Sequence, residues 1–310
     1  MMLHGQDRSM IMMDPKNKNA LYNLDLETGK VVDEWKMNEG INVNNFLPDA
    51  KFAQMTPNQT FVGTSHNAVF RIDPRLSGNE KMVDSQYKQY ASKNDFSAAT
   101  TTSNGKLAIA SNKGDIRLFD SIGKNAKTQL PALGDPIIGI DVTSDGRWIV
   151  ATCKTYLLLI DTLIGQGRYE GTLGFDRSFP ADAKPIPRKL TLKPEHVAYM
   201  DDEINFTSAR FNQGENAQET NIVTSTGPYV VTFNFKRIKQ GKLDAYKIQR
   251  YDDKIVADQF KFGGDRKIVA VQPHKVMQLD RRQLSRPSRQ SISTPTKSLK
   301  SRSSIVDSRY

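Results

Sequence analysis

KLAIASNKGDIRLFD (residues 106–120) and RWIVATCKTYLLLID (147–161) share the pattern that decides the fold. In each segment an apolar strand ends in small residues, a short turn follows, and a second apolar strand ends in Asp. Short runs of β-branched and aromatic residues around such turns are typical of β-hairpins. Four more segments repeat the pattern with small variations: NIVTSTGPYVVTFN (221–234), KIVAVQPHKVMQLD (267–280), TFVGTSHNAVFRID (60–73) and SMIMMDPKNKNALYNLD (9–25).

The polar residue at the end of each second strand sets a period along the chain. These strand-end anchors are Asp25, Asp73, Asp120, Asp161, Asn234 and Asp280. Successive anchors lie 48, 47, 41, 73 and 46 residues apart. Four spacings fit the roughly 40–50 residues of a propeller blade, and the fifth is one blade plus about 30 residues of insertion. Because no segment keeps an apolar period of 3.6 residues, the sequence predicts an all-β propeller with six visible blades.

The repeats predict one propeller domain over residues 1–280, with a long inserted loop at 163–195 that is rich in Gly and Pro. A Ser-, Arg- and Lys-rich tail at 281–310 is expected to be disordered. The first unit begins inside its inner strand, and the last stops after its third strand, at Asp280. We therefore expect an incomplete seven-bladed ring, from a truncated chain or an incomplete gene model, because an unpaired β-edge favours aggregation.

The charge of the chain is concentrated in the tail. The formal net charge is +10, and residues 281–310 hold eight Lys or Arg and one Asp, which is +7. The first 280 residues therefore carry +10 − 7 = +3, so a nucleic-acid-binding propeller is not expected. No apolar run approaches the ~20 residues of a membrane span, and the N-terminus lacks a secretory pattern. The single cysteine, Cys153, fits a reducing compartment, so we expect the cytoplasm, with the nucleus as the alternative.

The sequence offers no constellation for catalysis, cofactor binding or metal binding. Cys153 has no partner cysteine and is expected to be a buried structural thiol. The histidines are far apart and lack metal-ligand spacing: His4, His66, His196 and His274. A propeller enzyme would need acids and bases on inner strands, which offer only Asp95 and Asp141, without a histidine. We therefore predict no enzyme and no small-molecule substrate.

Two groups of polar residues have structural and functional interpretations. Since the strand-end anchors recur once per blade, they favour a turn device that accepts backbone hydrogen bonds, rather than a ring of binding carboxylates. Arg117, Arg147 and Lys154 lie near predicted blade turns and are candidate residues of a partner surface. The alternative is that they are ordinary solvated charges.

The tail carries two candidate phosphorylation sites. Arg281 and Arg282 precede Ser285, as basophilic kinases prefer, and Thr294 precedes Pro295. Each phosphate adds roughly −1.5 to −2 charges, so a few events cancel the +7. We hypothesise a phospho-switch that docks an acidic partner or an anionic membrane, with steep salt dependence, against the alternative of an inert solubilising tail. Deleting the tail should then reduce partner or membrane binding, and unchanged binding would refute the switch.

Several strings resemble one known family, the vacuolar import and degradation family of the Vid twenty-seven type, over roughly residues 1–280. The strings that carry the resemblance are KFAQMTPNQTFVG (51–63), LYNLDLETGKVVDEWK (21–36), NDFSAATTT (94–102), ASNKGDIRLFD (110–120) and LPALGDPIIGIDVTSDGRWIVATCKTYLLLIDTL (130–163). The resemblance implies a WD40-like propeller in a cytoplasmic protein, preceded by further blade sequence and a pleckstrin-like part. It also implies a link to vacuolar import and degradation of cargo, and no catalytic residues.

The chain departs from ordinary WD40 repeats at the residue before each anchor. The Trp of that signature is replaced by Leu24, Ile72, Phe119, Ile160, Phe233 and Leu279, and no Gly-His dipeptide opens a unit. Blade cohesion must therefore rest on apolar packing between sheets. The function that the sequence favours is a non-catalytic protein-interaction scaffold whose partners it does not identify. The alternative is polyanion binding through the tail.

Overall fold

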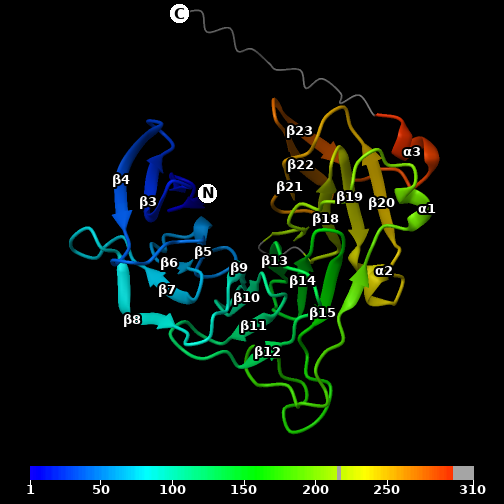
Figure 1. The fold of residues 1–310 in the computed structure, drawn as a ribbon. Coiled ribbons are helices and arrows are strands. Elements are labelled where there is room, and N and C mark those ends of the chain that lie inside the picture. The colour runs from blue at the N-terminus through cyan, green and yellow to red at the C-terminus, as the bar shows by residue number, and fades with distance from the viewer. Residues whose placement is uncertain (215–217, 296–310) are drawn as a thin grey trace, which may run out of the picture.

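A computed structural model describes residues 1–214 and 218–295, which form six antiparallel sheets arranged as blades around an axis (Figure 1). Blade 1 contains β1 (Met2–His4), β2 (Ser9–Asp14), β3 (Asn17–Asp25) and β4 (Lys30–Lys36). Blade 2 contains β5 (Asn45–Pro48), β6 (Phe61–Thr64), β7 (Ala68–Ile72) and β8 (Met82–Gln89), with the 3-10 helix η1 (Ala53–Met55) between β5 and β6. Blade 3 contains β9 (Phe96–Thr101), β10 (Leu107–Ser111), β11 (Ile116–Phe119) and β12 (Thr128–Leu130).

The second half of the chain continues the same up-and-down order. Blade 4 contains β13 (Gly139–Val142), β14 (Trp148–Thr152), β15 (Leu157–Asp161) and β16 (Arg188–Leu190). Blade 5 contains β17 (Arg210–Phe211), β18 (Asn221–Thr226), β19 (Tyr229–Asn234) and β20 (Tyr246–Arg250). Blade 6 contains β21 (Ala257–Phe260), β22 (Lys267–Gln272) and β23 (Lys275–Asp280). The short helices are α1 (Pro194–Val197), α2 (Phe235–Lys239) and α3 (Arg289–Ser293). The predicted all-β arrangement of six blades is confirmed.

Apolar contacts between neighbouring sheets hold the blades together. Residues 157–160 of β15 are all buried, because both faces of blade 4 are covered by adjacent blades. At the interface of blades 4 and 5, the ring of Phe235 lies 5.7 Å from Trp148 and 5.0 Å from Phe211, both edge-on. Aromatic pairs in this geometry contribute about 0.5–1.5 kcal/mol beyond their buried area. Sheet-to-sheet packing of this kind stabilises blades that lack the Trp-Asp signature.

The prediction of a loop over residues 163–195 is wrong in part, because this range contains the outer strand of blade 4 and the start of α1. β16 pairs with β15 from Leu157↔Leu190 to Leu159↔Arg188. Its three residues are too short to show an alternating pattern, and only pairing with β15 defines them as a strand. The remaining excursion is also anchored, since Phe175 is fully buried and Leu163 bridges to Leu173.

The expectation of a disordered tail is wrong for residues 281–295, which we call the clasp. The clasp runs back along blade 5, and the backbone N–H of Ile248 in β20 donates to the carbonyl of Ser285 at 3.2 Å. Leu284 and Ile292 are buried, in the cores of blades 6 and 5 respectively. The polar average composition of this segment predicted disorder. Burial of two apolar side chains is nevertheless enough to hold a short segment in place. Residues 296–310 lie outside the described part of the chain.

Helix α3 gives the clasp its compact end. Ser288 caps the helix by accepting from the backbone N–H of Ser291, and the Ser291 side chain in turn accepts from the Ser288 N–H. This reciprocal capping box satisfies backbone groups that a short helix otherwise leaves unpaired. None of the helices in residues 1–214 and 218–295 is long and apolar enough to cross a membrane.

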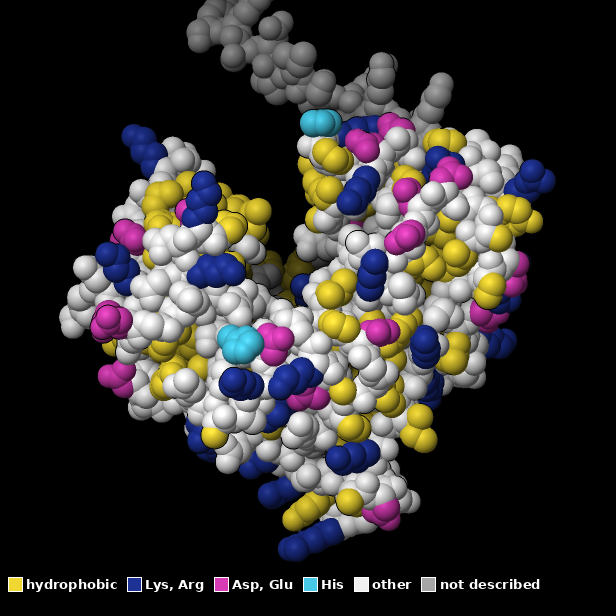
Figure 2. All heavy atoms as spheres, viewed as in Figure 1, with side chains coloured by type: hydrophobic (Ala, Val, Ile, Leu, Met, Phe, Trp, Pro, Cys, Tyr) yellow, Lys and Arg dark blue, Asp and Glu magenta, His cyan; other side chains and the backbone are white. Residues whose placement is uncertain are grey.

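The ring is open between blade 1 and blade 6, and a deep gap separates them in the space-filling view (Figure 2). Blade 6 has three strands where the other five blades have four, as the end of the last repeat at Asp280 predicts. Within the described residues, β23 is therefore the outermost strand of its sheet.

Replacing Ile292 with Ala tests the docking of the clasp. Ile292 is 0% exposed, so the substitution leaves a cavity and should lower the free energy of unfolding by about 2–5 kcal/mol. Ile186→Ala removes the same atoms from a side chain that is 89% exposed, and should change it by less than about 0.5 kcal/mol. Urea unfolding measures both, and similar values for the two variants would contradict a docked clasp.

Candidate functional site

A buried ion pair lies where the inner strands converge. The Lys51 ammonium is 2.9 Å from a carboxylate oxygen of Asp141, and their side chains are only 4% and 2% exposed. Lys51 comes from the connection after β5, and Asp141 from β13. The same ammonium also donates to the carbonyl of Val142. A charge pair this deep is tolerated only when further hydrogen bonds satisfy both groups.

The ion pair connects four blades through these additional hydrogen bonds. The second carboxylate oxygen of Asp141 accepts from the backbone N–H of Phe211, in blade 5, at 2.9 Å. The backbone N–H of Lys51 donates to the carbonyl of Thr102, in blade 3, at 3.0 Å. Asp141 is one of the two inner-strand acids that a channel enzyme could use. In this structure it instead takes part in the contacts that hold blades 2, 3, 4 and 5 together.

A polar cavity of about 480 Å3 surrounds this ion pair at the centre of the ring. Besides Lys51 and Asp141, its lining includes Arg210, Gln213 and Gln259. The Arg210 guanidinium donates to the carbonyl of Ile140 at 3.2 Å. Among the described residues, the lining offers carboxylate, ammonium, amide, guanidinium and threonine hydroxyl groups, and it contains no histidine, cysteine or serine.

The other acids near the inner strands also have local roles. Asp95 has a positive φ of 58° and contacts the Nδ1 of His66 at 2.9 Å on the exposed surface. Asp258, at the inner strand of blade 6, accepts from the Thr207 hydroxyl at 2.6 Å. Burial raises the pKa of Asp258, which favours its neutral form.

The histidines and the cysteine are dispersed, as the sequence predicts. His4 packs edge-on against Trp35 and Phe61, and burial lowers its pKa. His196 contacts the Tyr246 hydroxyl through Nδ1. Cys153 is buried, and burial raises the pKa of its thiol. Within residues 1–214 and 218–295, no three His, Cys, Asp or Glu side chains are grouped so that they could hold a metal ion.

The strand-end anchors each lie at or just after the end of a blade's third strand. Five of the six accept a backbone N–H two or three residues ahead, at 2.9–3.1 Å. The pairs are Asp25 with Glu27, Asp73 with Arg75, Asp161 with Leu163, Asn234 with Arg237 and Asp280 with Arg282. The sixth, Asp120, forms an ion pair with Lys127 at 3.3 Å. This geometry is that of a turn device that terminates the strand.

The three candidate partner-surface residues do not form one surface patch in the structure. Arg117 lies within β11 and contacts Asp115 at 3.2 Å. Arg147 precedes β14 and Lys154 follows it, so these two lie at opposite ends of one strand and on opposite faces of the propeller. Lys154 borders a pocket.

The two candidate phosphorylation sites lie in the clasp. The side chain of Ser285 is exposed, while its carbonyl accepts from β20. Thr294 is exposed and is the residue that caps the C-terminal end of α3. Both hydroxyls are accessible, but phosphorylation of either residue in these sequence contexts stays a prediction.

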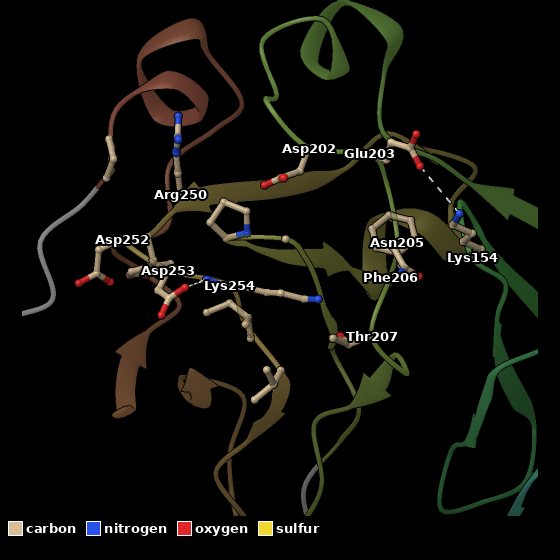
Figure 3. A pocket seen from close by; sticks show the side chains of 16 residues that line it. Lys154, Asp202, Glu203, Asn205, Phe206, Thr207, Arg250, Asp252, Asp253 and Lys254 are labelled. Atoms are coloured by element: carbon tan, nitrogen blue, oxygen red, sulfur yellow. Dashed lines mark hydrogen bonds and ion pairs between the residues drawn. The ribbon is translucent and has the colours of Figure 1, made fainter. Parts of the chain in front are cut away.

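A pocket of about 830 Å3 opens where blades 4, 5 and 6 meet on one face (Figure 3). We call it the acidic-rimmed pocket. Its rim carries exposed charged side chains from three connections: Lys154, Asp202, Glu203, Asp252, Asp253 and Lys254. Its apolar lining includes Phe206, Pro228, Tyr251, Ile255, Val256 and Pro295, and Arg250 also lines the pocket. In Figure 3, Asp252 and Asp253 lie on one side, and Glu203 and Lys154 on the other.

Local contacts fix the shape of the pocket. Gln272 donates to a carboxylate oxygen of Asp252 at 3.2 Å and to the carbonyl of Asp253 at 2.7 Å. The hydrogen bond from Gln272 is the main cause of the lowered pKa of Asp252. On the opposite side, Gly227 has a positive φ of 52°, which favours glycine, and the Asp202 carboxylate packs where a Cβ at this position would lie 2.8 Å from its oxygen.

Sequence reasoning missed this pocket, although two short acidic runs, one of three residues and one of two, mark it. Asp201-Asp202-Glu203 and Asp252-Asp253 lie in the connections that flank blade 5. They are about 50 residues apart in sequence, roughly one blade, so each reads as an ordinary solvated loop until adjacent blades bring them together.

Comparison with known proteins assigns the family. The model of the VID27 C-terminal WD40-like domain matches residues 1–298. The chain belongs to this family. It is 53% identical over 314 residues to Vacuolar import and degradation protein 27 of Schizosaccharomyces pombe, and 44% identical over 275 residues to the protein of that name from Saccharomyces cerevisiae. These alignments cover 100% and 86% of this chain, but only 39% and 35% of the two relatives.

Solved propellers share the fold of this VID27-family chain. Hsv2 of Kluyvelomyces marxianus superposes with a TM-score of 0.55 at 11% identity, covering 90% of this chain and 77% of that one. The Cps50 (Swd1) β-propeller domain of Myceliophteria thermophila gives 0.56 at 12% identity, with coverages of 86% and 77%. At such low identity, the similarity concerns the fold alone.

Replacing Lys51 with Met tests the central ion pair. The substitution leaves Asp141 buried without its cation, so the free energy of unfolding should fall by about 3–5 kcal/mol. Lys154→Met makes the same chemical change in a side chain that is 62% exposed, and should cost less than about 1 kcal/mol. Adding Asp141→Asn to Lys51→Met should recover part of the loss, because no buried charge then remains. Chemical denaturation checks all three, and a mild effect of Lys51→Met would contradict the cross-blade role.

Proposed function

We propose that this VID27-family chain is a non-catalytic protein-interaction platform in vacuolar import and degradation, and that its partner binds in the acidic-rimmed pocket. The link to that process comes from the names of the two relatives. The observation that carries the proposal is the pocket itself, a large concave site with an apolar lining and charged rim. Concave sites of this kind bind ligands by burying apolar groups and orienting them with a few polar contacts.

The chemistry of the pocket favours a polypeptide partner with a basic residue beside apolar ones. Asp202 and Asp253 are exposed carboxylates from two different connections that line the pocket, and both can pair with Lys or Arg of a partner. Lys154 and Glu203 lie 3.9 Å apart with 62% and 92% exposure, so either can exchange this contact for one with the partner. The apolar lining includes Val256, which is 51% exposed and offers surface to bury.

The central channel supports a non-enzymatic role. Its carboxylate, Asp141, holds the blades together through Lys51 and Phe211. The channel lining supplies no histidine or thiol to pair with it. We propose a cytoplasmic location, with the nucleus as the alternative, because a single cysteine in the sequence fits a reducing compartment.

Charge reversal in the pocket tests the proposal. The immobilised chain is exposed to Schizosaccharomyces pombe extract, and bound proteins are quantified by mass spectrometry. Asp202→Lys with Asp253→Lys should reduce capture of a specific partner at least fivefold, because both rim carboxylates are replaced by cations. Glu170→Lys with Asp182→Lys makes the same charge change on exposed positions of the blade 4 excursion and should leave capture unchanged. Equal capture by the two double variants, or no partner at all, would count against the proposal.

A further inference from the structure

The end of the clasp borders the acidic-rimmed pocket. Pro295, the last residue of the clasp, lines the pocket together with Arg250 of β20. Thr294 directly precedes Pro295, is exposed, and has an extended backbone with φ −105° and ψ 118°. A protein kinase binds its substrate segment in an extended conformation. Thr294 is therefore presented as a substrate residue one position from the pocket lining.

The sequence around Thr294 is typical of substrates of proline-directed kinases. Ser or Thr precedes Pro at only two places in the chain, Thr56-Pro57 and Thr294-Pro295. Some of these kinases also select a basic residue three positions after the acceptor. Lys297 occupies that position after Thr294, whereas Gln59 occupies it after Thr56. The sequence thus favours Thr294 over Thr56 as the acceptor.

The two threonine hydroxyls also differ in their contacts. The Thr56 hydroxyl donates to the carbonyl of Ala53 at 2.7 Å. Within residues 1–214 and 218–295, the Thr294 hydroxyl forms no hydrogen bond. A hydroxyl without such a contact can enter a kinase active site without breaking one. The structure and the sequence therefore favour the same acceptor.

Arg250 joins the end of the clasp to the rim of the pocket. Its Nη1 donates to the carbonyl of Ser293 at 3.2 Å and lies 2.7 Å from a carboxylate oxygen of Asp201. In Figure 3 the guanidinium points toward α3. Both contacts use the same nitrogen, and the buried Nε has no hydrogen-bond partner among the described residues. Arg250 thus keeps an unused donor beside the residue that precedes Thr294.

A phosphate on Thr294 is a stronger partner for Arg250 than the carboxylate of Asp201. It carries about −1.5 to −2 charges, and a guanidinium binds phosphate through two parallel N–H donors. Asp201 is 65% exposed, so it can leave Arg250 and return to solvent at little cost. The phosphate charge then adds to exposed carboxylates of the two connections beside it: Asp201, Asp202, Glu203, Asp252 and Asp253.

We propose that Thr294 is a phosphorylation site whose phosphate binds Arg250 and makes the mouth of the acidic-rimmed pocket more acidic. The Thr294 hydroxyl oxygen attacks the γ-phosphorus of ATP held by a proline-directed kinase, and the bond from that phosphorus to the β–γ bridging oxygen breaks. ADP leaves, and the hydroxyl proton passes to the catalytic Asp of the kinase. The consequence for binding, tighter capture of a basic partner, rests on the proposed function.

Phosphorylation of the intact, folded chain tests the site itself. The chain is incubated with ATP and a proline-directed kinase that selects a basic residue three positions after the acceptor, and the products are mapped by mass spectrometry. Thr294 should be the main acceptor, with Thr56 largely unmodified. Thr294→Ala should remove this product.

Phosphorus NMR over a pH series tests the contact with Arg250. The second pKa of a phosphothreonine is ordinarily about 6. It should be lower by about 0.5 or more in the native chain than in Arg250→Gln, because a neighbouring cation favours the dianion. Arg250→Lys keeps the charge and should retain part of the lowering, which separates loss of the cation from disturbed packing.

Arg188→Gln is the matched control for the NMR measurement. Arg188 of β16 donates from Nη1 to the carbonyls of Ile238 and Lys239, both at 2.9 Å, as Arg250 does to the end of α3. The substitution therefore makes the same chemical change beside α2, on another blade. It should leave the phosphate pKa at the value of the native chain.

Capture from extract tests the consequence for the pocket. The phosphorylated chain should retain about threefold more of the partner that the charge-reversal variants define, because added negative charge attracts a basic partner. Thr294→Ala treated with the same kinase should capture no more than the untreated chain.

The proposal fails if the kinase modifies Thr294 only after the chain is unfolded. It also fails if Arg250→Gln and Arg188→Gln give the same phosphate pKa, since the phosphate would then lie away from Arg250. Equal capture by the modified and unmodified chains would overturn the effect on the pocket. The kinase and NMR readouts involve no partner, so they can fail while the proposed function stands, and they can succeed while it falls.

Discussion

The buried ion pair between Lys51 and Asp141 is the interaction on which the arrangement of the blades depends. The two residues are 90 positions apart in sequence, and their contact brings blade 2 against blade 4 across the axis. Two charges removed from water are costly unless further hydrogen bonds satisfy them, and here the carbonyl of Val142 and the backbone N–H of Phe211 supply such bonds. The backbone N–H of Lys51 adds a hydrogen bond to Thr102 of blade 3. Because the buried charged groups need these hydrogen bonds, the ion pair constrains the positions of four blades together.

Around this polar centre, apolar packing between sheets stabilises the blades, a role that the Trp-Asp signature has in ordinary WD40 blades. The aromatic contacts of Phe235 with Trp148 and Phe211 illustrate it at the interface of blades 4 and 5. Dispersion and hydrophobic burial lack the directionality of a polar network, so each interface can use different residues. This freedom explains why the repeats diverge in sequence while keeping one architecture.

The acidic-rimmed pocket and the clasp both follow from that architecture. Blade connections meet on the faces of the ring, so loops separated by about one repeat become neighbours, as Asp202 and Asp253 do. The clasp uses the outer edge of blade 5, where β20 still has backbone groups to share, and Ile292 adds a buried contact. The pocket and the clasp thus lie at the ends and edges of the sheets, while the strands form the framework that supports them.

The sequence by itself determined the features that depend on near neighbours. Strand order, the blade period and the strand-end anchors were predictable, because an anchor such as Asp161 accepts its hydrogen bond from a residue only two positions ahead. Tertiary structure alone decided the rest. The partner of Lys51, the outer strand β16, the docking of Ile292 and the acidic-rimmed pocket all depend on segments far apart in sequence. Only the packing of complete blades around the axis brings such segments within contact distance, and no local pattern encodes that geometry.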